Sequence, residues 1–160
     1  FVIRTLRSYF LDTAGAQADM IIADTLFEQV VDMPIVEVLR GGKNKRQVSA
    51  QGVASIIKVF APTHAFVERT GAMPNQGTAS MYAFGRAAGI IEGALASFSV
   101  PITYINPLVW QKATGCAKGK DAIRHRCMEL HPEHQHLFAR VKDSGRADAT
   151  MIAYFGSQAK

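Results

Sequence analysis

The sequence is poor in cysteine and has no long hydrophobic segment, and both absences narrow the classes of protein it can belong to. Only two cysteines occur in 160 residues, Cys116 and Cys127, and they form no CxxC pair. This argues against a disulfide-stapled secreted domain and favours reduced thiols. No apolar run approaches the roughly 18 residues of a membrane-spanning helix, so no membrane partner is expected. A Walker-type phosphate loop and a GxSxG nucleophile elbow are also missing.

Acidic residues are in the minority. The chain has 13 Asp and Glu against 18 Lys and Arg, which gives a formal net charge of +5. Because each cation that meets a phosphate releases a condensed counterion, this balance favours a polyanionic partner. The basic residues gather in segments 40–46, 112–126 and 140–146, whereas the acids are spread thinly. The length and a hydrophobic content of 48% predict one compact domain over residues 1–160.

The N-terminal third predicts strands. Short apolar segments alternate with turns and indicate a three-strand meander near residues 9–11, 20–23 and 29–38. Segment 40–46, with its two glycines, predicts a loop or hairpin tip. Ser49 is typical of an N-cap and predicts a helix over about 50–60, which Pro62 ends.

The remainder predicts alternating strands and helices. A short buried strand at Ala65–Val67 delivers Glu68 at its end. The other elements are expected at about 77–98 (helix), 102–105 (strand), 107–110 (helical turn), 120–130 (helix) and 144–156 (helix). The order β-β-β-α-β-α-β-α-α predicts an α/β sheet with helices on its faces.

Three acids stand where a metal site could be built. Hydrolysis of a phosphodiester by two hard cations needs three or four converging carboxylates. Glu68 follows a strand, and Asp143 and Asp148 border the last helix. Within a continuous helix two acids five residues apart diverge by about 140°, so these two converge more easily if Asp143 precedes the helix as a cap. The simpler alternative is an exposed strand-end acid and two ordinary helix-start acids.

Four motifs, in this order and spacing, resemble RuvC-like Holliday junction resolvases of the phage type, and the plant chloroplast resolvase is similar in the same places. They are VERTGAMPNQG with SMYAFGR (67–77 and 80–86), WQK (110–112), KDAIR (120–124) and KDSGRADA with IAYFG (142–149 and 152–156). The match covers roughly residues 29–156. The resemblance implies an RNase H-like fold, with a mixed five-stranded sheet flanked by helices.

The resemblance also implies a catalytic set. Glu68, Asp143 and Asp148 fall on metal-binding carboxylates that hold two Mg²⁺ or Mn²⁺ ions, and Lys120 falls on a basic position near the scissile phosphate. The first catalytic Asp of the family has its best counterpart in Asp12, within FLDTAGA. The family's Pro-Gly after that Asp is missing here, and Asp19 and Asp24 are the less favoured alternatives. Lys120 could instead be a solvated lysine at a helix start.

Contacts to DNA are expected from basic residues and from one loop. Segment 70–77 could insert into the centre of a junction, or it could be a structural turn before the long helix. Each basic residue has the alternative of a solvated charge or an ion pair within the protein. The candidates are Lys43, Lys45, Arg46, Arg69, Met73, Asn75, Lys112, Lys118, Arg124 and Arg146.

The long helix carries glycines four residues apart, at Gly85, Gly89 and Gly93. Each costs about 1 kcal/mol relative to alanine within a helix, so close approach of another backbone should compensate. That backbone could be the sheet of the same subunit or the same helix of a second one. The resemblance favours the second, and therefore a homodimer.

Other residues have simpler interpretations. His125, His131, His134 and His136 match no zinc spacing and are expected at the surface or at helix ends. Trp110 is expected to be a core anchor and not a platform for base stacking. The chain begins with Phe1 and not Met, so a removed targeting peptide stays open. We expect an intracellular protein, of a phage or bacterial cytoplasm or of an organelle.

The combined hypothesis is a structure-selective endonuclease that resolves four-way DNA junctions by paired, symmetric nicks. Two alternatives stay open. One is a general nuclease of flaps and branched DNA. The other is a catalytically inactive RNase H-like scaffold that binds junctions, which the departure around Asp12 would favour.

Overall fold

The computed structural model describes residues 2–3, 7–11, 19–24, 29–69, 71 and 77–158, with only the backbone described before Val30. Its strands are β1 (Val2–Ile3), β2 (Arg7–Leu11), β3 (Asp19–Asp24), β4 (Gln29–Asp32), β5 (Ile35–Arg40), β6 (Lys43–Val48), β7 (Ala65–Glu68) and β8 (Ile102–Ile105). Its helices are α1 (Ala50–Phe60), α2 (Thr78–Ser97), α3 (Pro107–Ala113), α4 (Lys120–Leu130) and α5 (Ser144–Gln158), with 3-10 turns η1 (Pro132–Leu137) and η2 (Val141–Asp143).

A mixed sheet forms the centre. Strands β2, β3 and β4 are an antiparallel meander, and β7 lies parallel to both β2 and β8. The strand path is therefore β8-β7-β2-β3-β4, with the two-residue β1 paired antiparallel to β7. The expected mixed α/β sheet is present. The described sheet has six strands and not five, because β1 adds to the five-strand path.

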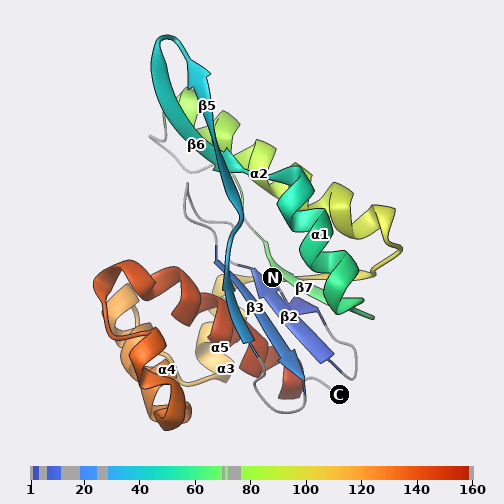
Figure 1. Cartoon of the computed structure of the whole chain (residues 1–160). Coiled ribbons are helices and arrows are strands. Elements are labelled where there is room, and N and C mark those ends of the chain that lie inside the picture. The colour runs from blue at the N-terminus through green and yellow to red at the C-terminus, as the bar shows by residue number, and fades with distance from the viewer. Residues whose placement is uncertain are drawn as a thin grey trace.

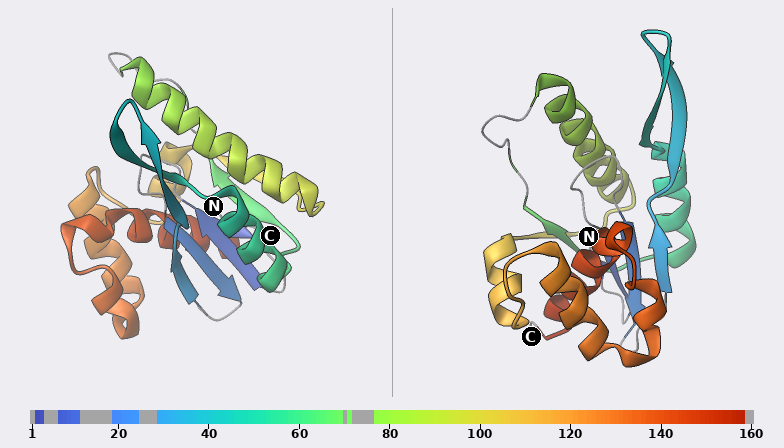
Figure 2. Two further views of the ribbon diagram at one scale, coloured as in Figure 1. Left: turned by 45° about the horizontal axis from the view of Figure 1, so that its top comes forward. Right: turned by 90° about the vertical axis from the view of Figure 1, so that its left-hand side faces the viewer.

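Helices cover both faces of the sheet (Figures 1 and 2). On one face, α1 and α2 pack with Ala65 and Val67 of β7. On the other, α3, α4 and α5 pack with Phe66. This division follows from the alternation of side chains along a strand. The ring of Phe66 lies so close to Gly156 of α5 that a Cβ there would stand 2.8 Å from it. The helices on each side therefore pack their apolar faces against the sheet.

The third predicted strand, 29–38, is interrupted. β4 ends at Asp32, and β5 pairs instead with β6 in a separate two-stranded sheet. Pro34 stands at the break and has no N–H to give to a ladder, while its carbonyl accepts the N–H of Ser49 at 2.8 Å. Gly41 and Gly42, at φ +59° and +72°, form the turn, as in the two-residue loops that suit hairpins. The predicted hairpin tip is therefore confirmed, and its ladder is longer than expected.

The predicted helices agree with the structure within about two residues, because their caps and breakers are local signals. The Ser49 hydroxyl accepts the N–H of Gly52 at 3.1 Å and caps α1, as expected. Asn106 caps α3 by accepting the N–H of Leu108 at 2.9 Å. The turns η1 and η2 were not predicted. Among the described helices, none is long and apolar enough to cross a membrane.

Candidate active site and nucleic-acid interface

Glu68 lies at the carboxyl end of β7, half-buried. By strand alternation it faces the same side as Phe66, toward α5. The indole N–H of Trp110 donates to Oε1 of Glu68 at 2.9 Å. Trp110 is only 1% exposed and belongs to the cluster that contains α5 residues. Its expected role as a core anchor is confirmed, and its hydrogen bond to Glu68 is a function that the sequence analysis missed.

The end of β2 lies beside the end of β7. Leu11 pairs with Val67 in the parallel ladder. Asp12, the residue after Leu11 in the sequence, lies outside the described residues. Of the two alternatives, Asp19 pairs with Asp32 at this same end of the sheet. Asp24 pairs with Arg7 at the opposite end, which disfavours it.

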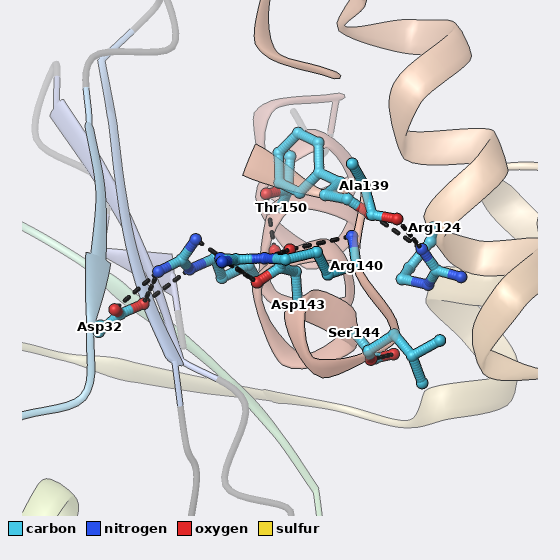
Figure 3. Close-up of polar contacts among 10 residues, drawn as sticks. Asp32, Arg124, Ala139, Arg140, Asp143, Ser144 and Thr150 are labelled. Atoms are coloured by element: carbon cyan, nitrogen blue, oxygen red, sulfur yellow. Dashed lines mark hydrogen bonds and ion pairs between the residues drawn. The ribbon is translucent and has the colours of Figure 1, made fainter. Parts of the chain in front are cut away.

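Asp143 immediately precedes α5 in η2, and its side chain is 3% exposed. The backbone N–H and the Nε of Arg140 donate to Oδ2 at 3.0 and 2.9 Å, and the Nη2 of Arg140 donates to Oδ1 at 2.9 Å (Figure 3). Arg146 adds an ion pair at 3.7 Å. Arg140 holds the pKa of the Asp143 carboxyl below its usual value, chiefly by the side-chain hydrogen bond. The carboxylate is therefore ionised and already bound by two arginines.

Arg146 continues this network to the sheet. Its Nε and Nη2 donate to the two carboxylate oxygens of Asp32, both at 2.7 Å. Such bidentate pairs are the geometrically most specific ion pairs. The contact ties the end of β4 to the first turn of α5 (Figure 3). Neither Asp32 nor Arg140 was a predicted site residue. No local sequence pattern marks the contact between Asp32 and Arg146, because these two residues are 114 positions apart.

Asp148 lies half-buried on α5. Burial is the main cause of the raised pKa of the Cys116 and Cys127 thiols, and the charge of Asp148 adds the smallest contribution to each. Helix α5 packs on β2 and β7, so the element that carries Asp148 lies against the strand that carries Glu68. Over the described residues, however, no three Asp, Glu, His or Cys side chains are close enough to hold a metal ion together. Glu68, Asp143 and Asp148 therefore do not form one ligand cluster in the described part of the chain.

Some of the basic candidates are exposed, whereas others already form hydrogen bonds and ion pairs within the protein. Arg124 is 6% exposed, and its guanidinium donates to Phe138 O at 3.1 Å, Ala139 O at 3.0 Å and Asp121 at 2.6 Å. Arg146 is bound by Asp32. Contacts of these two arginines with DNA stay predictions that their positions do not favour. The exposed candidates are Lys43, Lys45, Arg46, Arg69, Lys112, Lys118 and Lys120, while Met73 and Asn75 lie outside the described residues.

The glycine row of α2 faces away from the rest of the described chain. Gly85, Gly89 and Gly93 are exposed, and a Cβ built on any of them would meet no atom within 4 Å. Packing of this row on the sheet of its own subunit, one of the two expected explanations, is therefore wrong for the described residues.

Histidine and cysteine form no metal site in the described part of the chain. His131 lies at the end of α4, and His134 and His136 lie in η1, in agreement with the expected positions at helix ends. Both cysteines are free thiols, as expected.

Comparisons with known proteins identify the fold. No protein-family model and no curated sequence matches the chain. Solved structures do match, among them two of RuvC. The first, "T. thermophilus RuvC in complex with Holliday junction substrate", has a TM-score of 0.54 and 15% identity and covers 92% of this chain and 92% of that one. The second, of Thermus thermophilus RuvC, has a TM-score of 0.52 and 13% identity and covers 93% and 96%. The chain therefore has the RuvC-like, RNase H-like fold that the sequence motifs predicted.

Proposed function

We propose that this chain is a metal-dependent endonuclease that resolves four-way DNA junctions. One observation carries the proposal: Glu68 ends β7 beside the end of β2, where Asp12 follows, and faces the helix that bears Asp148. A structure of the same fold holds a Holliday junction substrate, which supports the choice of substrate.

The donor set suits a hard cation, because carboxylate oxygens are the ligands that Mg²⁺ and Mn²⁺ prefer. Asp12, Glu68, Asp143 and Asp148 would hold two such ions. When bound, the ions supply the positive charge that activates a water and stabilises the leaving oxygen. Trp110 orients Glu68 through one oxygen, Oε1. Arg140, whose side chain is 57% exposed, must release Asp143 before that carboxylate can serve as a ligand.

The surroundings of these acids suit a polyanionic substrate. Lys120 begins α4, Lys112 lies exposed in the last turn of α3, and Lys118 lies exposed between α3 and α4. In this proposal Lys120 lies near the scissile phosphate and the two other lysines bind flanking phosphates. None of the three has an ion pair among the described residues that would have to be broken first.

We also propose that the active form is a homodimer. The open glycine row of α2 gives a second copy of the same helix a smooth surface on which to pack. A two-fold dimer would present two active sites to opposing strands of a junction, which itself has near two-fold symmetry. Paired, symmetric nicks follow from that arrangement.

The decisive experiment is cleavage of an end-labelled synthetic four-way junction in Mg²⁺. The wild type, Asp12→Asn, Glu68→Gln and the control Glu133→Gln, which changes an exposed acid of η1, are compared. We expect paired nicks from the wild type and the control, and binding without cleavage from the two other variants.

Other outcomes separate the alternatives. Binding without cleavage by the wild type in Mg²⁺ and in Mn²⁺ would overturn the nuclease and leave a junction-binding scaffold. Equal cutting of Y-forks and junctions would show a general branched-DNA nuclease. If Asp12→Asn still cuts while Glu68→Gln does not, the first ligand is another acid, and Asp19 is the next to change.

A further inference from the structure

The β5–β6 hairpin sorts its charges by face. The register pairs Arg40 with Lys43 and Val38 with Lys45, while Glu37 pairs with Arg46. Because directly paired residues share a face and neighbours alternate, Arg40, Lys43 and Lys45 lie on one face. Glu37 and Arg46 lie on the other, where Asn44 donates to Glu37 at 3.5 Å. The charged residues of one face are therefore all basic, whereas the other face carries both an acid and a base.

The basic face is the one that meets α2. The guanidinium of Arg40 lies 5.1 Å from the centre of the Tyr82 ring, and Arg86 of α2 donates to Gln47 on the same hairpin face. The hairpin and the first half of α2 extend together from one side of the molecule (Figures 1 and 2). We call Arg40, Lys43, Lys45 and Arg86 the hairpin–α2 surface.

Neither the hairpin nor the first half of α2 contributes an acid to this surface. Glu37 is the only acid of the hairpin and stands on its opposite face, and the first acid of α2 is Glu92, six residues beyond Arg86. Arg40, Lys43, Lys45 and Arg86 are all exposed. None of the four forms an ion pair within the described chain. Four cations without a protein counterion match the charge of a phosphate backbone.

We propose that the hairpin–α2 surface binds the phosphate backbone of a duplex DNA arm, away from the scissile bond and without reading its sequence. The proposal rests on the proposed function, because that function makes DNA the partner. It adds that one face of the hairpin binds and the other does not, so that Lys43 and Lys45 contact the arm whereas their neighbour Arg46 does not. A two-stranded ribbon is also narrow enough to follow the major groove.

The test compares matched losses of charge. Lys43→Gln/Lys45→Gln removes two cations from the basic face. The control, Arg46→Gln/Lys58→Gln, removes one from the opposite face and one exposed lysine from α1. Binding of a fluorescent four-way junction with long arms, and of a linear duplex, is measured by anisotropy over a series of salt concentrations, with Ca²⁺ in place of Mg²⁺.

We expect the Lys43→Gln/Lys45→Gln variant to bind both DNAs roughly tenfold or more weakly at moderate salt. The slope of log K against log salt should become shallower by about two, as for two lost phosphate contacts. The control should bind within about twofold of the wild type. Arms trimmed to a few base pairs should remove the difference between the two double variants.

Three outcomes would overturn the proposal: equal loss in both double variants, no loss in either, or a change in oligomeric state without loss of DNA binding. The last would assign this surface, with the exposed Met81 of α2, to a second copy of the chain. Failure of the proposed function looks different, since the wild type would then bind but not cleave while the variants still differed in affinity.

Discussion

Hydrogen bonds and ion pairs hold two acids of the candidate site. Glu68 is oriented by Trp110, and Asp143 is held by Arg140 and Arg146. In each case the acid lies at the end of an element and its partner comes from a neighbouring one or from the adjoining turn. A partner that orients a ligand commonly affects metal affinity nearly as much as the ligand does. The residues that hold the acids are therefore as testable as the acids themselves.

Trp110→Phe should separate orientation from packing. Phenylalanine keeps an aromatic ring in the core but removes the indole N–H that donates to Glu68. We expect the Mg²⁺ concentration for half-maximal cleavage to rise by about 10-fold or more. Stability should fall by about 1–3 kcal/mol, as for a buried hydrogen bond to a charged group. A Mg²⁺ titration of single-turnover cleavage and urea denaturation measure the two effects. An unchanged Mg²⁺ requirement would show that this hydrogen bond does not orient a metal ligand.

We expect proton uptake by His131 to lower the free energy of unfolding in mild acid. Its ring packs against Tyr154 with centroids 6.1 Å apart, and burial lowers its pKa, opposed by Glu133 and assisted by His134. The unfolded chain therefore takes up a proton first, at about pH 6.5. The stabilisation is complete above that pH and is lost as the pH falls toward the lower pKa of the folded state.

Urea denaturation at pH 7.5 and pH 5.5 measures this loss. We expect His131→Gln to weaken the dependence on pH, and His136→Gln, which changes an exposed histidine of η1, to retain the dependence of the wild type. Equal slopes in the wild type and His131→Gln would contradict the assignment.

At the scale of elements, two helices use glycine for opposite reasons. Gly156 of α5 lets the helix approach Phe66, since a Cβ would stand 2.8 Å from that ring, whereas a Cβ on Gly89 of α2 meets nothing. Gly156→Ala should destabilise the chain by about 1–3 kcal/mol through overpacking. Gly89→Ala should stabilise the isolated chain by up to about 1 kcal/mol. Denaturation at low protein concentration compares the two, and loss of stability in Gly89→Ala would contradict the open position of the row.

The same row provides a test of the proposed dimer. Gly89→Leu places a large side chain where the second helix would lie, so it should shift the protein from dimer to monomer in sedimentation velocity. The control is Ser55→Leu on the exposed side of α1, which should leave the dimer intact. A monomeric wild type, or a Gly89→Leu variant that stays dimeric, would remove the glycine row from the interface.

At the scale of the molecule, we expect the fold not to depend on the proposed metal site. Two apolar clusters cover the two faces of the sheet, and neither contains a carboxylate. Removal of divalent ions with EDTA should therefore abolish cleavage and leave the circular dichroism spectrum unchanged. The thermal midpoint should shift by only a few degrees, as expected for a bound ligand that adds only its own binding free energy. Unfolding in EDTA would show instead that the metal is part of the structure.

The sequence by itself determined the local features of this protein. It predicted α1 with its Ser49 cap, the buried strand that ends at Glu68, and the alternation of strands and helices that follows α1. It did not predict β1 or β6. Those predictions succeed because hydrophobic period, helix caps and proline act within a few residues of the chain. Glu68 and Asp143 could be chosen in the same way, since each one stands at an element boundary, whereas Asp148 lies inside α5.

Only the tertiary structure decided which distant groups meet. The Arg146–Asp32 pair joins residues 114 apart and the Trp110–Glu68 bond joins residues 42 apart, and no local pattern encodes either. The contact of the basic hairpin face with α2 and the open side of the glycine row likewise depend on how α2 packs. The physical reason is that a side chain's partner is set by the packing of whole elements, which is a property of the entire chain and not of a window within it.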